Sequence, residues 1–105
     1  MEDCFSQNKG ELWIRLPEEV DHHNAEEIRR RADRLLASGY ISRIVFDFSR
    51  TVFMDSSGIG VIMGRYKQIR FMGGRMELVH ANERIDRLLR MAGIYKLMEK
   101  REDGI

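Results

Sequence analysis

The chain has 105 residues, a length that fits one domain, and its hydrophobic fraction of 43% is enough for one core. Lys and Arg total 18 and Asp and Glu total 17, so a net charge of +1 gives no basic excess for binding nucleic acid or a membrane surface. Cys4 is the only cysteine, which excludes an intrachain disulfide, and no Cys and His residues have zinc-ligand spacing. We therefore expect neither a metal nor a cofactor.

The N-terminus predicts where the protein works. Residues 1–5 are acidic and lack the apolar run of a signal peptide. The apolar stretches of the chain are far shorter than the roughly 20 residues that a membrane span needs. We expect a cytoplasmic protein that does not bind a membrane.

The first half of the chain predicts two strands, a helix and a buried strand. Apolar side chains alternate over residues 11–16, and residues 5–7 can pair with them across a turn at 8–10. Asp21 is placed to N-cap a first helix, whose apolar stripe runs from residue 25 to 36. Residues 44–48 are apolar on both faces apart from Asp47, which predicts a central strand covered on both sides.

The second half repeats the strand–helix alternation. A second helix begins at the serines of residues 56–57 and ends at the glycine pair 73–74. Residues 76–79 are a strand, Asn82 caps a third helix, and residues 94–98 pack back as a last turn or short helix. We expect one α/β domain over residues 1–105, with a mixed or parallel sheet and disorder at 1–4 and 99–105.

The start of the second helix is unusual because it combines hydroxyls with glycines. The first N–H groups of a helix have no intrahelical partner, so a negative group on Ser56 or Ser57 would find donors there. Gly58 and Gly60 leave the approach to these serines open, whereas Gly64 suits tight helix packing. Asp55 can cap the helix or orient the Ser56 hydroxyl. From the residues alone, either serine can be the functional one, or the segment can be only a helix cap.

Catalytic motifs are not complete in this segment. Met54 stands where the G-x-S-x-G elbow of hydrolases needs glycine, and the glycine pattern fits no phosphate-binding loop. A serine hydrolase would also need a histidine base, for which His22, His23 and His80 are the candidates. Phe53 reads as a packing residue.

Residues 54–69, MDSSGIGVIMGRYKQI, resemble the signature of the anti-sigma factor antagonists, the STAS domain family. Residues 65–68, and the segments 20–26, 73–74 and 88–96, are similar to the sporulation stage II AA type, so the resemblance covers roughly residues 12–98. It implies the STAS fold, which is α/β with a small mixed β-sheet, βα repeats and helices packed around it. The motif would open the second long helix.

The resemblance also implies a function without catalysis. An anti-sigma factor antagonist of this type binds an anti-sigma factor that is also a serine kinase, and thereby frees a sigma factor for transcription in sporulation. The kinase phosphorylates the serine after the motif aspartate, here Ser56, which ends binding, and a PP2C-type serine phosphatase resets the switch. The residues that would contact the partner are Glu19, Asp21, Asp55, Ser57, Gly58 and Gly60.

One segment departs from the family pattern. Residues 16–21 read LPEEVD, where the family usually has a small residue and glycine before the acidic residue. Pro17 and Glu18 would make this turn stiffer and more charged than in the family, which would change the turn geometry and the contact at Glu19. Two alternatives stay open: a STAS module that senses a nucleotide or serves another signalling complex, and a serine enzyme that uses Ser56.

Overall fold

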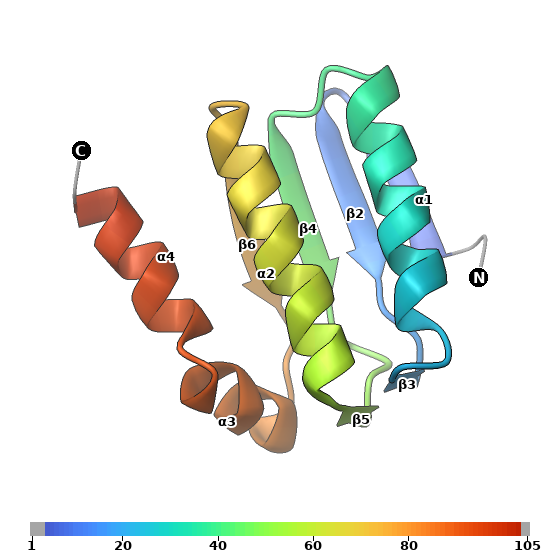
Figure 1. The fold of residues 1–105 in the computed structure, drawn as a ribbon, viewed down its shortest axis with the longest axis vertical. Helices are drawn as coiled ribbons and strands as arrows, with labels where there is room; N and C mark the ends of the chain where they lie inside the picture. Colours follow the sequence, from blue (N-terminus) through green and yellow to red (C-terminus); the bar gives the residue numbers. More distant parts are fainter. Residues whose placement is uncertain (1–3, 104–105) are drawn as a thin grey trace.

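The structure is a computed structural model that describes residues 4–103, with the backbone alone for 99–103. Strands and helices alternate along most of the chain (Figure 1). The elements are β1 (Phe5–Asn8), β2 (Glu11–Arg15), β3 (Glu19–Val20), α1 (Ala25–Ser38), β4 (Arg43–Asp47), β5 (Phe53–Met54), α2 (Ser56–Phe71), β6 (Arg75–Val79), α3 (Glu83–Met91) and α4 (Ile94–Asp103).

The main sheet is mixed, as the sequence predicts. Its order is β1-β2-β4-β6, with β1 antiparallel to β2 and the other neighbours parallel. The β1–β2 turn passes through Lys9 and Gly10 at φ +49° and +84°, a left-handed pair that suits a tight hairpin. The parallel strands are joined by α1 and α2, so all three strands deliver their carboxyl ends to one edge of the sheet.

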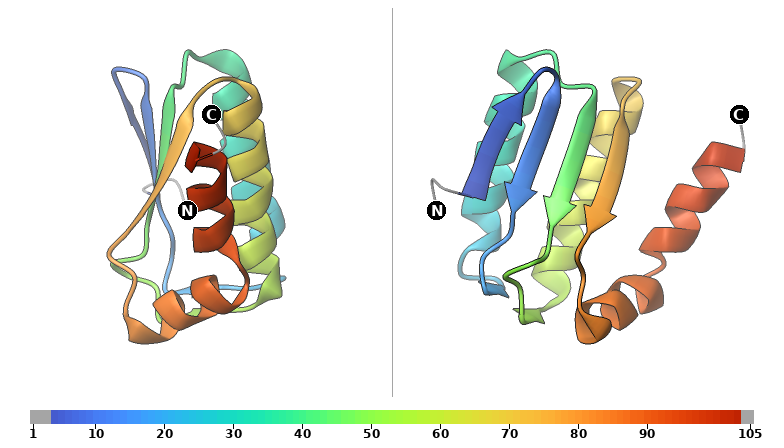
Figure 2. Two further views of the ribbon diagram at one scale, coloured as in Figure 1. Left: turned by 90° about the vertical axis from the view of Figure 1, so that its left-hand side faces the viewer. Right: turned by 180° about the vertical axis from the view of Figure 1, so that it is seen from behind.

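The helices lie on one face of the sheet only. Figure 2 shows α1 and α2 on one side of the strands and, from behind, the strands with no helix in front of them. Strand β4 is central and is buried on both faces over residues 44–47, as predicted, but no helix covers its second face (Figure 2). Val45 on the open face is nevertheless fully buried, because its register partners Trp13 and Glu77 flank it on the neighbouring strands.

Charged side chains replace a second helical layer on the open face. The Arg43 guanidinium forms ion pairs with Glu11 at 3.2 Å and with Glu77 at 2.8 Å, which links three strands. At the carboxyl end of β4, the carboxylate of Asp47 is buried beside the His80 ring at 3.1 Å. Burial alone would raise the pKa of Asp47, but hydrogen bonds from the Ser49 backbone N–H and from His80 outweigh it and lower that pKa.

The core fills the space between the sheet and the helices. Alternate strand residues point inward, and one stripe of each helix meets them. The members with no exposed surface are Leu12, Ile14, Val20, Ile28, Ala32, Ile44, Phe46, Ile62, Ile69 and Leu89, together with Val45 on the open face. Figure 1 shows α1 and α2 lying over the strands, with the axes of the two helices roughly parallel to each other.

A buried ion pair joins α1 to α2. Arg65 of α2 is only 8% exposed, and its Nε lies 3.3 Å from Oδ1 of Asp33 on α1. Burial lowers the pKa of Arg65, and the Asp33 carboxylate opposes that change. Breaking such a pair leaves a buried charge without its partner, so this contact helps to hold the second half of α2 against α1.

The C-terminal part is more helical than the sequence predicts. Asn82 caps α3 as expected, since its Oδ1 accepts a hydrogen bond from the Ile85 N–H at 2.8 Å. Helix α4 begins at Ile94, in agreement with the predicted last turn or short helix, and it extends to Asp103, where the sequence predicts disorder from residue 99. Cys4 is also placed, and it is buried. The rest of the predicted disorder, at 1–3 and 104–105, lies outside the described residues.

Candidate functional site

Two very short strands bring the predicted site segments together. Strand β3 pairs in parallel with β5, with Glu19 opposite Phe53 and Val20 opposite Met54. The ladder continues by one bond, because the Asp55 N–H donates to the Val20 carbonyl at 3.1 Å. Asp21, which follows β3, and Asp55 and Ser56, which follow β5, therefore lie at the same end of the molecule.

The segment around Pro17 fits this pairing. The Glu18 carbonyl accepts hydrogen bonds from the N–H groups of Val52 at 2.8 Å and Phe53 at 3.2 Å. Pro17 lacks an N–H, and no ladder bond is needed at that position. Glu19 is exposed, and its carbonyl accepts a bond from the side chain of Asn24 at 2.8 Å.

Asp55 caps α2, one of the two roles predicted for it. Its backbone is extended, at φ −108° and ψ −169°, and its Oδ1 accepts a hydrogen bond from the Ser57 N–H at 2.8 Å. Ser56 is then the first helical residue, and its side chain is exposed. Ser57 is half-buried. The first turn of α2 contains no acidic residue. The Ser57 N–H donates to the Asp55 carboxylate and the Gly58 N–H donates to the Asp55 carbonyl at 3.0 Å, so the turn offers two hydroxyls at the positive end of the helix dipole.

Asp21 does not cap α1, in contrast to the prediction. Helix α1 begins at Ala25, and residues 21–24 form a turn in which the Asp21 carbonyl accepts from the N–H groups of Asn24 and Ala25. The Asp21 carboxylate instead accepts a hydrogen bond from the His23 N–H at 2.9 Å, which is the main cause of its lowered pKa. The carboxylate thus stays on the surface beside the start of α2.

The glycines of α2 have roles different from those predicted. A Cβ on Gly58 would lie 2.4 Å from Met54 Cγ and 3.0 Å from Val20 Cγ1, so this buried glycine permits close packing on the β3–β5 pair. A Cβ on Gly60 or Gly64 would meet nothing within 4 Å. Gly60 leaves open surface next to Ser57, as predicted, whereas the predictions of an open approach at Gly58 and of tight packing at Gly64 are wrong.

A shallow hollow lies between the starts of the two long helices. Its volume is about 270 Å³, and its lining includes His22, Glu26, Ser57 and Gly60. No hydrogen bond joins Ser56 or Ser57 to a histidine within the described residues. The surface can offer N–H donors, hydroxyls and carboxylates to a partner molecule.

Sequence reasoning missed one exposed apolar residue close to these serines. Phe53 is 45% exposed on β5, although the sequence assigns it to packing. A β5 of two residues carries no periodicity, so no pattern could have shown which of its side chains points outward. Among residues 4–103, no three potential metal ligands cluster, and no helix is both long and apolar enough to cross a membrane.

Comparison with known proteins agrees with this architecture. The chain is 41% identical over 94 residues to the anti-sigma F factor antagonist of Paenibacillus polymyxa, covering 90% of this chain and 80% of the relative. It matches the structure of the anti-sigma factor antagonist SpoIIAA in its unphosphorylated form with a TM-score of 0.80 and 27% identity, covering 96% of each chain.

A second solved structure extends the comparison. The Bacillus cell fate determinant SpoIIAA in the phosphorylated form matches with a TM-score of 0.75 and 29% identity, covering 88% of this chain and 84% of that one. The STAS domain model matches residues 5–103. The fold, the relatives and the motif at the start of α2 together confirm the resemblance seen in the sequence, and the chain belongs to the STAS domain family.

Proposed function

We propose that this protein is an anti-sigma factor antagonist, a cytoplasmic binding protein rather than an enzyme, controlled by phosphorylation of Ser56. Unphosphorylated, it binds an anti-sigma factor that is a serine kinase and so releases a sigma factor for transcription in sporulation. Phosphorylation by the kinase ends the complex, and a PP2C-type serine phosphatase restores it. The observation that carries the proposal is an exposed serine at the first position of α2 in a chain whose relatives are named as such antagonists.

The choice of Ser56 over Ser57 follows from exposure. Ser56 is exposed and can enter the active site of a kinase. Ser57 is half-buried, and its N–H is already bound to the Asp55 carboxylate. One of the solved relatives exists in a phosphorylated form, which is consistent with a modification in this fold.

The switch needs only local electrostatics. A phosphate brings about −1.5 to −2 charges at pH 7, and in the free protein the positive end of the α2 dipole favours that charge. In the complex the same dianion would be desolvated next to the carboxylates of Asp21 and Asp55. A cost of about 1.4 kcal/mol weakens binding tenfold, and one badly placed charge can exceed this.

The partner surface follows from the same arrangement. Glu19 and Asp21 border the start of α2 from the β3 side, and Ser57 and Gly60 border it from the hollow. Asp55 lies between them as the cap of α2. Gly58 is buried, so we assign it a supporting role through the packing of α2 on Met54.

The test is phosphorylation by the anti-sigma factor encoded in the same genome, with ATP, read by intact mass. We expect one added phosphate on the wild type and on Ser57→Ala, and none on Ser56→Ala. Calorimetry should show tight binding of the wild type and weak binding of Ser56→Asp. An unmodified wild type, or equal binding by Ser56→Asp, would contradict the proposal. Tight nucleotide binding by the isolated domain would favour a nucleotide sensor, and ester turnover that is lost in Ser56→Ala would favour an enzyme.

A further inference from the structure

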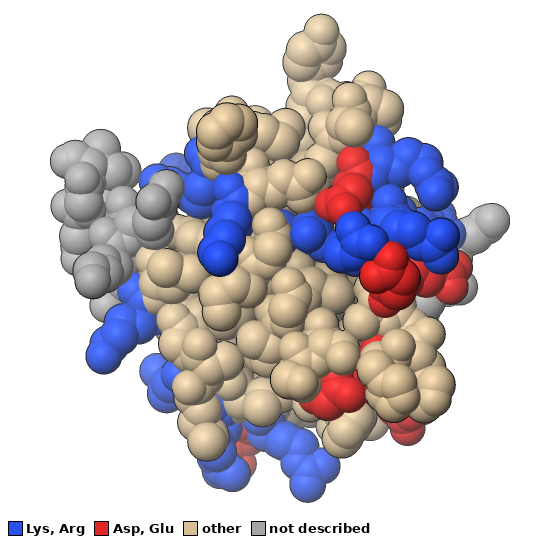
Figure 3. All heavy atoms as spheres, viewed as in Figure 1, with Lys and Arg blue, Asp and Glu red and all other residues tan. Residues whose placement is uncertain are grey.

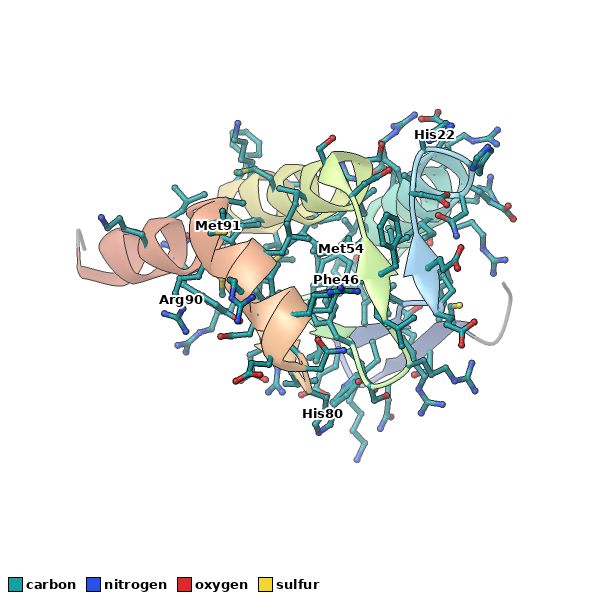
Figure 4. The ribbon with its side chains drawn as sticks, turned by 90° about the horizontal axis from the view of Figure 1, so that it is seen from below. His22, Phe46, Met54, His80, Arg90 and Met91 are labelled. Atoms are coloured by element: carbon teal, nitrogen blue, oxygen red, sulfur yellow. The ribbon has the colours of Figure 1, made fainter. Side chains whose placement is uncertain are left out.

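A second concave surface lies at the same end of the molecule as Ser56. A hollow of about 360 Å³ separates α3 from β5, and we call it the α3 groove. Figure 4 looks onto this end and shows Met54 and Met91 labelled in the region of β5 and α3. The apolar residues that line the groove are Phe53, Met54, Ile85, Leu88 and Met91.

The groove has a buried floor and exposed apolar walls. Ile85 and Met54 are nearly fully buried, at 1% and 5% exposure, so they form a fixed base. Phe53 is 45% exposed and Met91 is 78% exposed, although both side chains are large and apolar. Exposed apolar side chains that gather around a hollow are typical of a surface that another molecule covers.

The charges at the groove are not neutralised within the described chain. Arg84 and Arg87 line the groove, and neither guanidinium has a carboxylate partner among the described residues. Arg90 on the same helix does, because it pairs with Asp86 at 3.2 Å and lies over the Tyr95 ring. Figure 3 shows mainly Lys and Arg side chains along the lower edge of the molecule, where α3 lies.

The groove is continuous with the surface around Ser56. Phe53 lines the groove from β5, and three residues later Ser56 begins α2. Glu19, the register partner of Phe53, lies on the other side of β5. A protein that covers Ser56 and Glu19 therefore reaches the groove with a short further segment.

We propose that the α3 groove binds a segment of the anti-sigma factor that carries apolar side chains flanked by carboxylates. The apolar side chains enter between Phe53 and Met91, and the carboxylates pair with Arg84 and Arg87. The concave shape suits inserted side chains better than a flat lipid surface, and a net charge of +1 gives little general attraction to one. This inference rests on the proposed function, since it names a second contact of the same partner.

The test compares two pairs of charge reversals that change the net charge equally. Arg84→Glu/Arg87→Glu alters the groove, and Arg34→Glu/Lys96→Glu is the matched control at exposed positions on α1 and α4. With the purified anti-sigma factor as the probe, we expect the groove variant to bind about tenfold more weakly and the control to stay within about twofold of the wild type. Thermal unfolding verifies that both variants fold.

Two milder variants keep the test valid if the double reversal does not fold. Arg84→Gln/Arg87→Gln removes the charge only, and Met91→Ala shortens a side chain that is mostly exposed. Each should weaken binding by about threefold, while phosphorylation of Ser56 stays measurable.

Other results would overturn the inference in distinct ways. Groove variants that bind like the wild type, while Ser56→Asp does not bind, reject the groove and leave the proposed function intact. Failure of the wild type to bind the anti-sigma factor rejects both. If affinity for the anti-sigma factor is unchanged and the groove variant loses binding to phosphatidylglycerol vesicles, or loses self-association in sedimentation, the occupant is a membrane or a second copy of this chain.

Discussion

The two long helices begin side by side, yet their first turns differ in charge. Both follow a two-residue strand, and Val20 on β3 lies opposite Met54 on β5. The first turn of α1 contains Glu26 and Glu27. The first turn of α2 contains no acidic residue and instead offers two serines behind the capping carboxylate of Asp55. The carboxylates of Glu26 and Glu27 thus lie at the positive end of the α1 dipole, whereas the first turn of α2 can accept added negative charge.

This difference separates a structural helix start from one suited to regulation. A phosphate at the start of α1 would meet two carboxylates, and like charges at this spacing repel. A phosphate on Ser56 would meet the positive end of the α2 dipole and a single carboxylate, that of the cap Asp55. Substitutions at the two helix starts distinguish residues of α2 that serve stability from residues that serve the binding of a partner.

The largest effect on stability should come from Gly58→Ala. The new Cβ would lie 2.4 Å from Met54 Cγ, and Met54 is buried and cannot move freely. Overpacking should outweigh the helix propensity of Ala, and we expect the free energy of unfolding to fall by about 1–2 kcal/mol. Urea denaturation measures it. An unchanged midpoint would show that Gly58 is not a packing residue.

Asp55→Ala should come next. It removes the acceptor for the Ser57 N–H, and the loss of a helix cap costs about 1 kcal/mol. Asp55→Asn is the control, because it keeps a capping oxygen and should lose less. Asp21→Ala should have a smaller effect, since that carboxylate binds a turn N–H ahead of α1. Equal losses at Asp21 and Asp55 in thermal unfolding would remove the distinction between the two helix starts.

Gly60→Ala should separate stability from binding. Its Cβ meets nothing within 4 Å, so we expect the free energy of unfolding to rise by about 0.5–1 kcal/mol. Gly64→Ala should show the same gain one turn later. Only Gly60→Ala should also weaken binding of the anti-sigma factor, measured by calorimetry. If both variants bind like the wild type, the open surface at Gly60 serves no partner.

Ser56→Asp should fold with a stability close to that of the wild type. A carboxylate at the positive end of a helix is favourable, and the nearby Asp55 opposes it, so we expect a change within about 0.5 kcal/mol. Ser56→Asn is the neutral control. A large destabilisation by Asp but not by Asn, in urea denaturation, would show that the α2 start does not tolerate negative charge.

The smallest effect concerns the titration of Asp21. Its pKa is lowered mainly by the backbone N–H of His23, so His23→Ala should retain most of that shift in a carboxyl ¹³C NMR titration. Because the folded-state pKa is lowered, the interaction stabilises the protein above the ordinary value of 3.8 and is lost as the pH falls through the folded-state pKa. Return of the pKa to its ordinary value in His23→Ala would assign the shift to the ring.

Much of the fold follows from periodicity and capping in the sequence. Residues 11–16 and 76–79 predict β2 and β6 to within a residue or two at each end. Asn82 and Asp55 predict the starts of α3 and α2, because each combines a good cap with the apolar pattern that follows. These signals are local, and a single sequence carries them fully.

The remaining features depend on contacts between distant segments. Asp21 is as good a cap as Asp55, but residues 21–24 are held in a turn because the Asn24 side chain accepts from the Asp21 N–H and donates to the Glu19 carbonyl. The β3–β5 pair is too short to leave a pattern, so neither the crowding at Gly58 nor the exposure of Phe53 could be foreseen. The absence of helices from one face of the sheet could not be predicted, because Val45 on that face is apolar and is buried without a helix above it.

The burial of Cys4 has a practical consequence for measuring these predictions. The only thiol of the chain is 5% exposed and forms no disulfide, so it should react slowly with thiol reagents. Asn8→Cys would place a second, exposed thiol on β1 at the hairpin, at the opposite end of the sheet from Ser56 (Figure 1). A maleimide dye attached there would report binding by fluorescence anisotropy without touching either helix start.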